Sequence, residues 1–123
     1  MRKRTKLKIG EFSKLMQVTV KTLRHYEQMG LLVPDEVNQW SGYRYYTLEQ
    51  MQKLNSIRHL KDIGFSLEEI KGIYDDDYHE PSIGQIEAKL MECNRQIQML
   101  QRRRQQLIDI ANSHKNIKTK LCA

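Results

Sequence analysis

The sequence predicts a mainly α-helical protein, with a winged helix-turn-helix domain followed by one long helix. Three observations lead to this fold class: apolar residues recur at helical spacing, a short β-prone stretch interrupts them over residues 31–46, and a heptad pattern follows. The expected boundaries are a domain at 1–74, a linker at 75–81, a long helix at 82–114 and a flexible C-terminal tail at 115–123.

Composition limits what the chain can do. Of its 123 residues, Trp 1, Tyr 6 and Phe 2 are the aromatic counts, so a large substrate cavity is not expected. The net charge of +6 is uneven, with balances of +6 over residues 1–30, −5 over residues 31–80 and +5 over residues 81–123. Basic ends around an acidic middle are typical of a protein with a polyanion-facing surface, and nucleic acid is the expected partner.

The first two predicted helices form a helix-turn-helix. One helical face of the first gathers its apolar residues, which are Ile9, Phe12, Leu15 and Met16. Thr19 can cap a second helix over about residues 20–29, which Gly30 ends. This helix should bury Val20, Leu23 and part of Tyr26. It presents the donor-rich side chains that reading a major groove requires, which are Lys21, Thr22, Arg24 and His25.

Residues 31–46 combine turn formers with β-prone residues and predict a small hairpin, or wing. A two-stranded hairpin is marginally stable alone, so Tyr45 or Tyr46 is expected to pack it against the neighbouring helices. The wing therefore belongs to the same domain as the helix-turn-helix.

A second helix pair follows the wing. Thr47 can cap a helix that runs to about Asp62, and its apolar face comprises Leu48, Met51, Leu54, Ile57 and Leu60. Ser66 and Glu69 have the spacing of a capping box at the start of a fourth helix.

The heptad pattern beyond Pro81 predicts a dimer. A helix of about 32 residues would be about 48 Å long, more than the small domain could cover. Its apolar seam needs a partner helix, most simply that of a second copy. The expected dimerisation residues are Ile83, Ile86, Leu90, Cys93, Ile97, Leu100 and Leu107.

Between about residues 7 and 73 the sequence resembles the MerR-type transcriptional regulators. The segments that carry this resemblance stand in the family's order and spacing; they are Lys8-Ile9-Gly10-Glu11-Phe12, Val18-Thr19-Val20-Lys21-Thr22-Leu23-Arg24-His25-Tyr26-Glu27, Gly30-Leu31-Leu32, Ser41-Gly42-Tyr43-Arg44-Tyr45-Tyr46 and Ile63-Gly64-Phe65-Ser66-Leu67-Glu68-Glu69-Ile70-Lys71. The resemblance implies an antiparallel coiled-coil homodimer that binds a promoter and distorts its spacer, so that RNA polymerase can use it. Much of the specificity would then come from DNA deformation.

The resemblance also implies where DNA is contacted. The recognition helix, the wing and the end of the third helix supply the expected DNA-binding residues, which are Thr19, Lys21, Thr22, Arg24, His25, Tyr26, Tyr43, Arg44 and Lys61. Tyr43 and Arg44 stand at wing positions that touch the DNA backbone, and Lys61 stands by the second wing.

Three features depart from the family pattern. His25 stands where a second Tyr is usual, which can alter base preference. Gln17 replaces a frequent turn Gly, so the turn must avoid a strongly positive φ or tolerate strain. Glu36 and Val37 lie in a wing stretch where many members carry Arg.

The two cysteines exclude several effector chemistries. Cys93 and Cys122 lack the loop spacing of a metal-sensing pair and are too few for an iron–sulfur cluster, so no metal or cofactor is expected. The wing sequence looks most like the family branch that senses organic compounds, such as multidrug-responsive regulators. A small-molecule effector is expected only if a C-terminal domain follows this chain.

Two other function classes compete with this interpretation. In the first, the coiled coil is a protein-interaction module and the N-terminal domain is a cap that does not bind DNA. In the second, the chain is an enzyme, but the sequence shows neither a catalytic constellation nor a pocket-sized core. With no signal peptide and no apolar run long enough for a membrane span, we expect a cytoplasmic protein that is not an enzyme.

Overall fold

The structure, a computed structural model, describes residues 5–76 and 79–122, and the side chains of these residues as far as 116. The chain forms two compact units, residues 1–80 and 81–123, which we describe separately. Among the described residues, no helix is long and apolar enough to cross a membrane.

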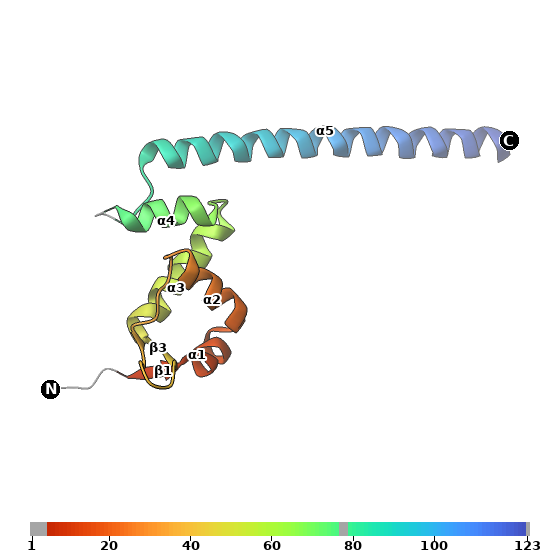
Figure 1. The fold of residues 1–123 in the computed structure, drawn as a ribbon. Helices are drawn as coiled ribbons and strands as arrows, with labels where there is room; N and C mark the ends of the chain where they lie inside the picture. Colours follow the sequence, from red (N-terminus) through yellow and green to blue (C-terminus); the bar gives the residue numbers. More distant parts are fainter. Residues whose placement is uncertain (1–4, 77–78, 123) are drawn as a thin grey trace. The chain divides into compact units, whose positions relative to one another are not determined.

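The fold is mainly helical with one small sheet, which confirms the predicted fold class (Figure 1). In chain order the elements are β1 Lys6–Lys8, α1 Ile9–Met16, α2 Val20–Gln28, β2 Glu36–Val37, β3 Arg44–Thr47, α3 Leu48–Asp62, α4 Leu67–Asp75 and α5 Ile83–Cys122. The helix starts agree with the predicted caps because the capping side chains are local signals: Thr19, Thr47 and Ser66 each accept a hydrogen bond from the third residue after them.

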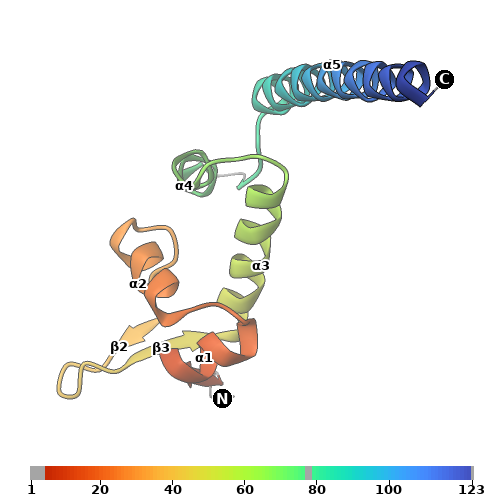
Figure 2. The same cartoon turned by 90° about the vertical axis from the view of Figure 1, so that its right-hand side faces the viewer.

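The sheet has three antiparallel strands in the order β1-β3-β2. Leu7 of β1 lies opposite Tyr46, and Val37 of β2 lies opposite Arg44. Strand β1 was not predicted, because it is short and both its ends are lysines. Figure 2 shows the loop between β2 and β3 projecting away from the helices, as a wing does.

The core of the first unit is built around an aromatic pair. The rings of Phe12 and Tyr46 stack with centroids 4.5 Å apart, and both side chains are fully buried. Tyr46 thus supplies the wing packing expected of Tyr45 or Tyr46. The remaining buried apolar residues are Met16, Leu23, Tyr26, Leu31, Leu32, Leu54, Ile57, Leu60, Phe65, Ile70 and Ile73.

Three residues assigned to the apolar faces lie outside this core. Leu15 and Leu48 are 58% and 64% exposed, and Val20 is 36% exposed. In each helix the buried stripe is narrower than the predicted one, because the small domain covers only part of each helix surface.

The turn between α1 and α2 is held in a left-handed conformation without glycine. Gln17 adopts φ 54° and ψ 49°. Ser13 Oγ donates a hydrogen bond to the carbonyl oxygen of Val18, and Arg58 of α3 donates one to the carbonyl oxygen of Met16. Of the two possibilities for Gln17, the chain adopts the strained one, and these hydrogen bonds hold it there.

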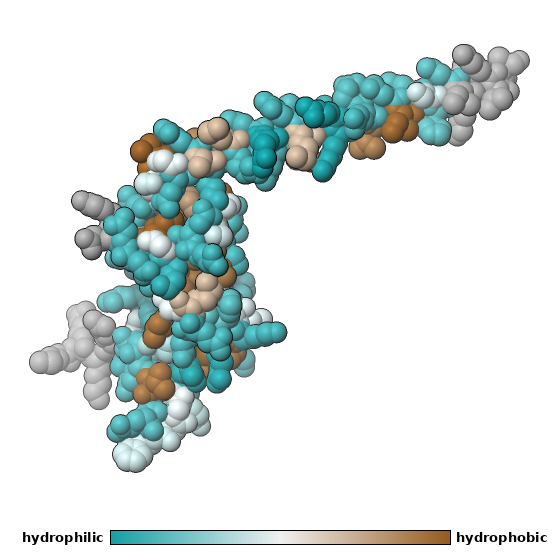
Figure 3. All heavy atoms as spheres, turned by 45° about the horizontal axis from the view of Figure 1, so that its top comes forward, coloured by the Kyte–Doolittle hydropathy of each residue, from teal (hydrophilic) through white to brown (hydrophobic). Residues whose placement is uncertain are grey.

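The long helix α5 begins as predicted but ends later. Ser82 and Gln85 form reciprocal hydrogen bonds at its start. The predicted helix end at 114 is wrong, since α5 continues to Cys122; the predicted tail at 115–123 is therefore helical as far as the structure describes it. The apolar side chains along its described part are exposed, and Figure 3 shows such patches on its surface.

Substitution of Gln17 by Gly should stabilise the domain. A residue with a Cβ loses about 1–2 kcal/mol in the left-handed region, whereas Gly adopts it freely. Because Gly also costs about 0.4–1 kcal/mol through the greater entropy of the unfolded chain, we expect Gln17→Gly to raise the free energy of unfolding in urea by a net amount of about 0.5–1 kcal/mol. Gln17→Ala keeps the Cβ and should bring no such gain; an equal gain would contradict the strain at this turn.

Removal of the Tyr46 hydroxyl should not destabilise the protein. This buried oxygen has no hydrogen-bond partner among the described residues, and burial raises the pKa of Tyr46 to about 12. Unfolding releases that proton more easily, so Tyr46 weakens the fold as pH rises from 10 towards 12. Tyr46→Phe should therefore match or exceed the wild-type melting temperature at neutral pH and lose less of it at alkaline pH.

Candidate nucleic-acid interface

Helix α2 presents a row of polar side chains from its N-terminus onward. Thr19 Oγ1 accepts a hydrogen bond of 3.0 Å from the Thr22 amide and lies 2.8 Å from Thr22 Oγ1. Lys21, Arg24 and His25 are exposed beyond them. These five residues were predicted as DNA contacts. In the structure four of them are exposed, and Thr22 is partly exposed.

Tyr26 differs from the other predicted contacts on α2. It is 4% exposed and belongs to the core. The reason is helical geometry, because Tyr26 follows the fully buried Leu23 by three residues and so lies on the same face. The structure gives Tyr26 a packing role, and the expectation that it meets DNA does not fit this burial.

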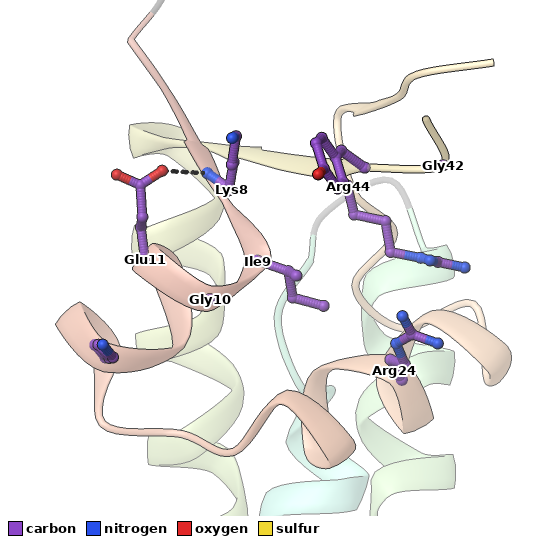
Figure 4. Close-up of a pocket in the computed structure, with 9 residues that line it drawn as sticks. Lys8, Ile9, Gly10, Glu11, Arg24, Gly42 and Arg44 are labelled. Atoms are coloured by element: carbon purple, nitrogen blue, oxygen red, sulfur yellow. Dashed lines mark hydrogen bonds between the residues drawn. The ribbon is translucent and has the colours of Figure 1, made fainter. Parts of the chain in front are cut away.

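A groove lies between the start of α1, the middle of α2 and the wing. Its volume is about 420 Å³. Figure 4 shows Arg24 and Arg44 near one another on one side and Lys8 and Glu11 on the other. The lining includes more cations than carboxylates; its charged members are Lys8, Glu11, Lys14, Arg24 and Arg44. The exposed lining of the groove is mostly apolar, and the excess of cations around it can attract an anionic backbone.

Hydrogen bonds within the wing loop hold the wing side of the groove. Asn38 Oδ1 accepts hydrogen bonds from the amides of Trp40 (2.9 Å) and Ser41 (3.0 Å). Gly42 follows with φ 75°, and the ring of Tyr43 lies 4.8 Å from Lys8 Nζ. Tyr43 is 55% exposed, so the predicted wing contact faces solvent beside the groove.

Arg44 is paired within the protein. Its Nε and Nη2 donate hydrogen bonds of 2.6 and 3.4 Å to the two carboxylate oxygens of Glu27. Both side chains are 25% exposed, and the hydrogen bond to Glu27 raises the pKa of Arg44 above its ordinary value. Sequence reasoning missed this pair, because the partners are 17 residues apart and no periodic pattern connects them.

The acidic start of the wing is also paired. Lys6 Nζ lies 3.2 Å from Asp35 and 2.8 Å from Glu36. These hydrogen bonds raise the pKa of Lys6 above its ordinary value. Glu36 therefore forms part of the contact between β1 and β2, in the wing stretch where the family often has Arg.

The remaining predicted residues lie elsewhere. Lys61 is exposed in the last turn of α3 and does not line the groove. The predicted dimerisation residues are all exposed on α5; they are Ile83, Ile86, Leu90, Cys93, Ile97, Leu100 and Leu107. Among the described residues no three His, Cys, Asp or Glu side chains come together as a metal site would require, and the absence of a metal stays a prediction.

Two family models match the chain. Residues 7–77 match the MerR HTH family regulatory protein model, and residues 51–110 match the model described as MerR, DNA binding. The relative "HTH-type transcriptional regulator ZntR" from Escherichia coli (strain K12) is 36% identical over 111 residues, which cover 83% of this chain and 78% of ZntR.

Two solved structures have the same fold with clear sequence identity. The EcmrR–DNA complex in EcmrR-RPo, solved by cryo-EM, is 39% identical with a TM-score of 0.69, and the match covers 76% of this chain and 34% of EcmrR. The N-terminus of MtaN, the Bacillus subtilis multidrug transporter activator, is 28% identical with a TM-score of 0.67, covering 82% of this chain and 97% of that one. The similarity to MtaN agrees with the expected resemblance to multidrug-responsive regulators.

Proposed function

The chain belongs to the MerR family of DNA-binding helix-turn-helix transcriptional regulators, and we propose that it acts as a homodimer that distorts the spacer of a double-stranded promoter. The single observation that carries the proposal is the basic groove bounded by α1, α2 and the wing. An anionic backbone that follows this groove brings the exposed face of α2 to the base edges.

Each proposed contact follows from the chemistry of its side chain. Arg24 is exposed on α2 and can donate to a guanine edge or to phosphate oxygens. Lys21 and Lys61 are exposed cations that can neutralise phosphates. The other proposed contacts are hydroxyl and imidazole donors that fix the register on the duplex, namely Thr19, Thr22, His25 and Tyr43.

The dimer is proposed from the uncovered surface of α5. Leu90, Ile97 and Leu100 are 58%, 48% and 59% exposed in the described chain. Burying one such side chain contributes about 1.5–3 kcal/mol, so a partner helix that covers the seam is strongly favoured. An antiparallel arrangement of two α5 helices would give a two-fold symmetric pair of DNA-binding heads, matched to a promoter with two half-sites.

Distortion of the spacer explains how binding could control transcription. Two linked heads on one face of a duplex gain contacts when the DNA bends or twists towards them, and the cost of that deformation depends on sequence. RNA polymerase is the proposed second partner, because the similar EcmrR–DNA complex was solved in EcmrR-RPo. Since the partner is promoter DNA, the proposed place of action is the cytoplasm.

The alternative is a coiled-coil interaction module with an inert cap. The groove argues against this alternative. Like charges from α1, α2 and the wing repel one another where they line one groove, and an inert cap offers no ligand that would compensate for this repulsion. A role without enzymatic activity is proposed with this function, and a small-molecule effector belongs to the proposal only for a form that carries a further domain.

Arg24→Ala should weaken specific DNA binding without affecting the dimer. We expect a loss of about 10- to 100-fold on a duplex selected by the wild-type chain from a random library, measured by fluorescence anisotropy at fixed salt. On an unrelated duplex of equal length the loss should be smaller.

The matched control is Arg102→Ala, which removes the same charge from the exposed surface of α5. It should leave the selectivity between the two duplexes as in the wild type. Equal effects of the two substitutions would contradict the assignment of α2 as the recognition helix.

Leu100→Asp should convert the dimer to monomers in analytical ultracentrifugation. A carboxylate placed in the apolar seam must be desolvated without a partner, which costs several kcal/mol in two copies, roughly as for other unpaired buried charges. Gln98→Asp introduces the same residue off the seam and should keep the dimer. A dimeric Leu100→Asp variant would refute the heptad register.

A further inference from the structure

We propose that Glu27 and Arg44 form a clamp that positions the wing against the recognition helix α2. Arg44 then supports DNA binding by pairing with Glu27, and does not itself contact a DNA phosphate. This inference rests on the proposed function, since it concerns the same groove. Glu27 and Arg44 are then positioning residues. The clamp also explains why an acidic residue, Glu27, lies close to a surface that is proposed to bind DNA.

The geometry of the pair supports a positioning role. Arg44 is the first residue of β3 and Glu27 lies in the last turn of α2. The guanidinium donates from Nε and Nη2 to both carboxylate oxygens, a two-point contact that fixes orientation as well as distance. Because both side chains are three-quarters buried, salt screens this pair less than a surface ion pair.

The wing needs such a contact. Strand β2 has two residues, and its pairing with β3 is a hairpin too short to be stable alone. Lys6 and Lys8 tie the hairpin to β1 through Glu36 and Tyr43. The Glu27–Arg44 pair ties it to α2 directly, and Gly42 and Tyr43, which line the groove, stand immediately before Arg44. The clamp therefore fixes the wall of the groove opposite α1.

Charge alone and the clamp predict opposite changes in DNA affinity when the carboxylate of Glu27 is removed. This residue follows Arg24, which lines the groove, by three positions on α2, so its carboxylate is a neighbour of Arg24 on the helix surface. A carboxylate there repels phosphates, and its removal would tighten DNA binding if electrostatics were its only role. If the clamp holds the wing, its removal weakens binding although the site becomes more positive. The sign of the change separates the two explanations.

The first arm compares variants that each remove one charge of the pair and keep a polar side chain, on the selected duplex at fixed salt. We expect Glu27→Gln and Arg44→Gln each to weaken binding about 10-fold, and the double variant to be little weaker than either, because both remove one interaction. The matched control is Glu11→Gln, which removes the same charge from the lining of the groove and retains an acceptor for the Lys8 amide. It should tighten binding.

The second arm tests whether Arg44 contacts a phosphate. A lost phosphate contact lowers the slope of log K against log salt by about 0.9. We expect Arg24→Ala to lower the slope or alter base preference, and Arg44→Gln to keep the wild-type slope. Two results would overturn the clamp. One is a decrease of about 0.9 in the salt slope of Arg44→Gln, and the other is an affinity of Glu27→Gln for the duplex as high as that of the wild type.

The third arm needs no DNA. The amide of Asn38 donates to the carbonyl of Tyr43 at the base of the wing loop, and its hydrogen exchange reports wing opening. We expect this exchange to be at least 10-fold faster in Glu27→Gln, with global unfolding unchanged in urea. Unchanged exchange would refute the clamp. If the wild-type chain failed to bind any duplex, the proposed function would fall, while this arm would still decide on the clamp.

Discussion

Strand β3 is the element on which the rest of the first unit depends. Within four residues it pairs with β1 on one side and β2 on the other, and it buries Tyr46 against Phe12 of α1. Its first residue, Arg44, reaches Glu27 of α2, and its last, Thr47, caps α3. A wing, two helices of the helix-turn-helix and the following helix are thereby held by one short strand, so a shift of its register would displace every wall of the groove.

How far the sequence predicted this arrangement depends on the range of each signal. Thr19 and Ser66 start helices through side-chain contacts three residues away, and such local signals were read correctly. Leu15 was misassigned because an apolar residue on a helical face is buried only where another element covers it. Tyr26 was expected at the DNA from family resemblance, although its spacing from Leu23 already placed it on the buried face.

The features that prediction missed are pairings distant in sequence. Strand β1 exists because Leu7 meets Tyr46 across 39 residues, and nothing in Lys6-Leu7-Lys8 alone marks a strand. The basic groove was predicted as a charge balance over residues 1–30 and as separate DNA contacts, Arg24 and Arg44 among them, but not as one hollow lined by α1, α2 and the wing together. The prediction ended α5 with the heptad pattern at 114, whereas the described helix continues to Cys122 through residues that include neither Pro nor Gly.

The positive charge of the groove depends on the partners of the carboxylates in and near it. Glu11 accepts a hydrogen bond from the Lys8 amide, Glu27 faces Arg44, and Glu36 meets Lys6. Each acidic side chain near the groove is thus committed to a contact that supports a wall. The side chains of Lys14, Lys21 and Arg24 form no hydrogen bond or ion pair elsewhere in the described chain, so their charge remains free to face a ligand. Acidic residues can therefore help to build the groove, while the cations that form no such contact keep a net positive charge that attracts a polyanion.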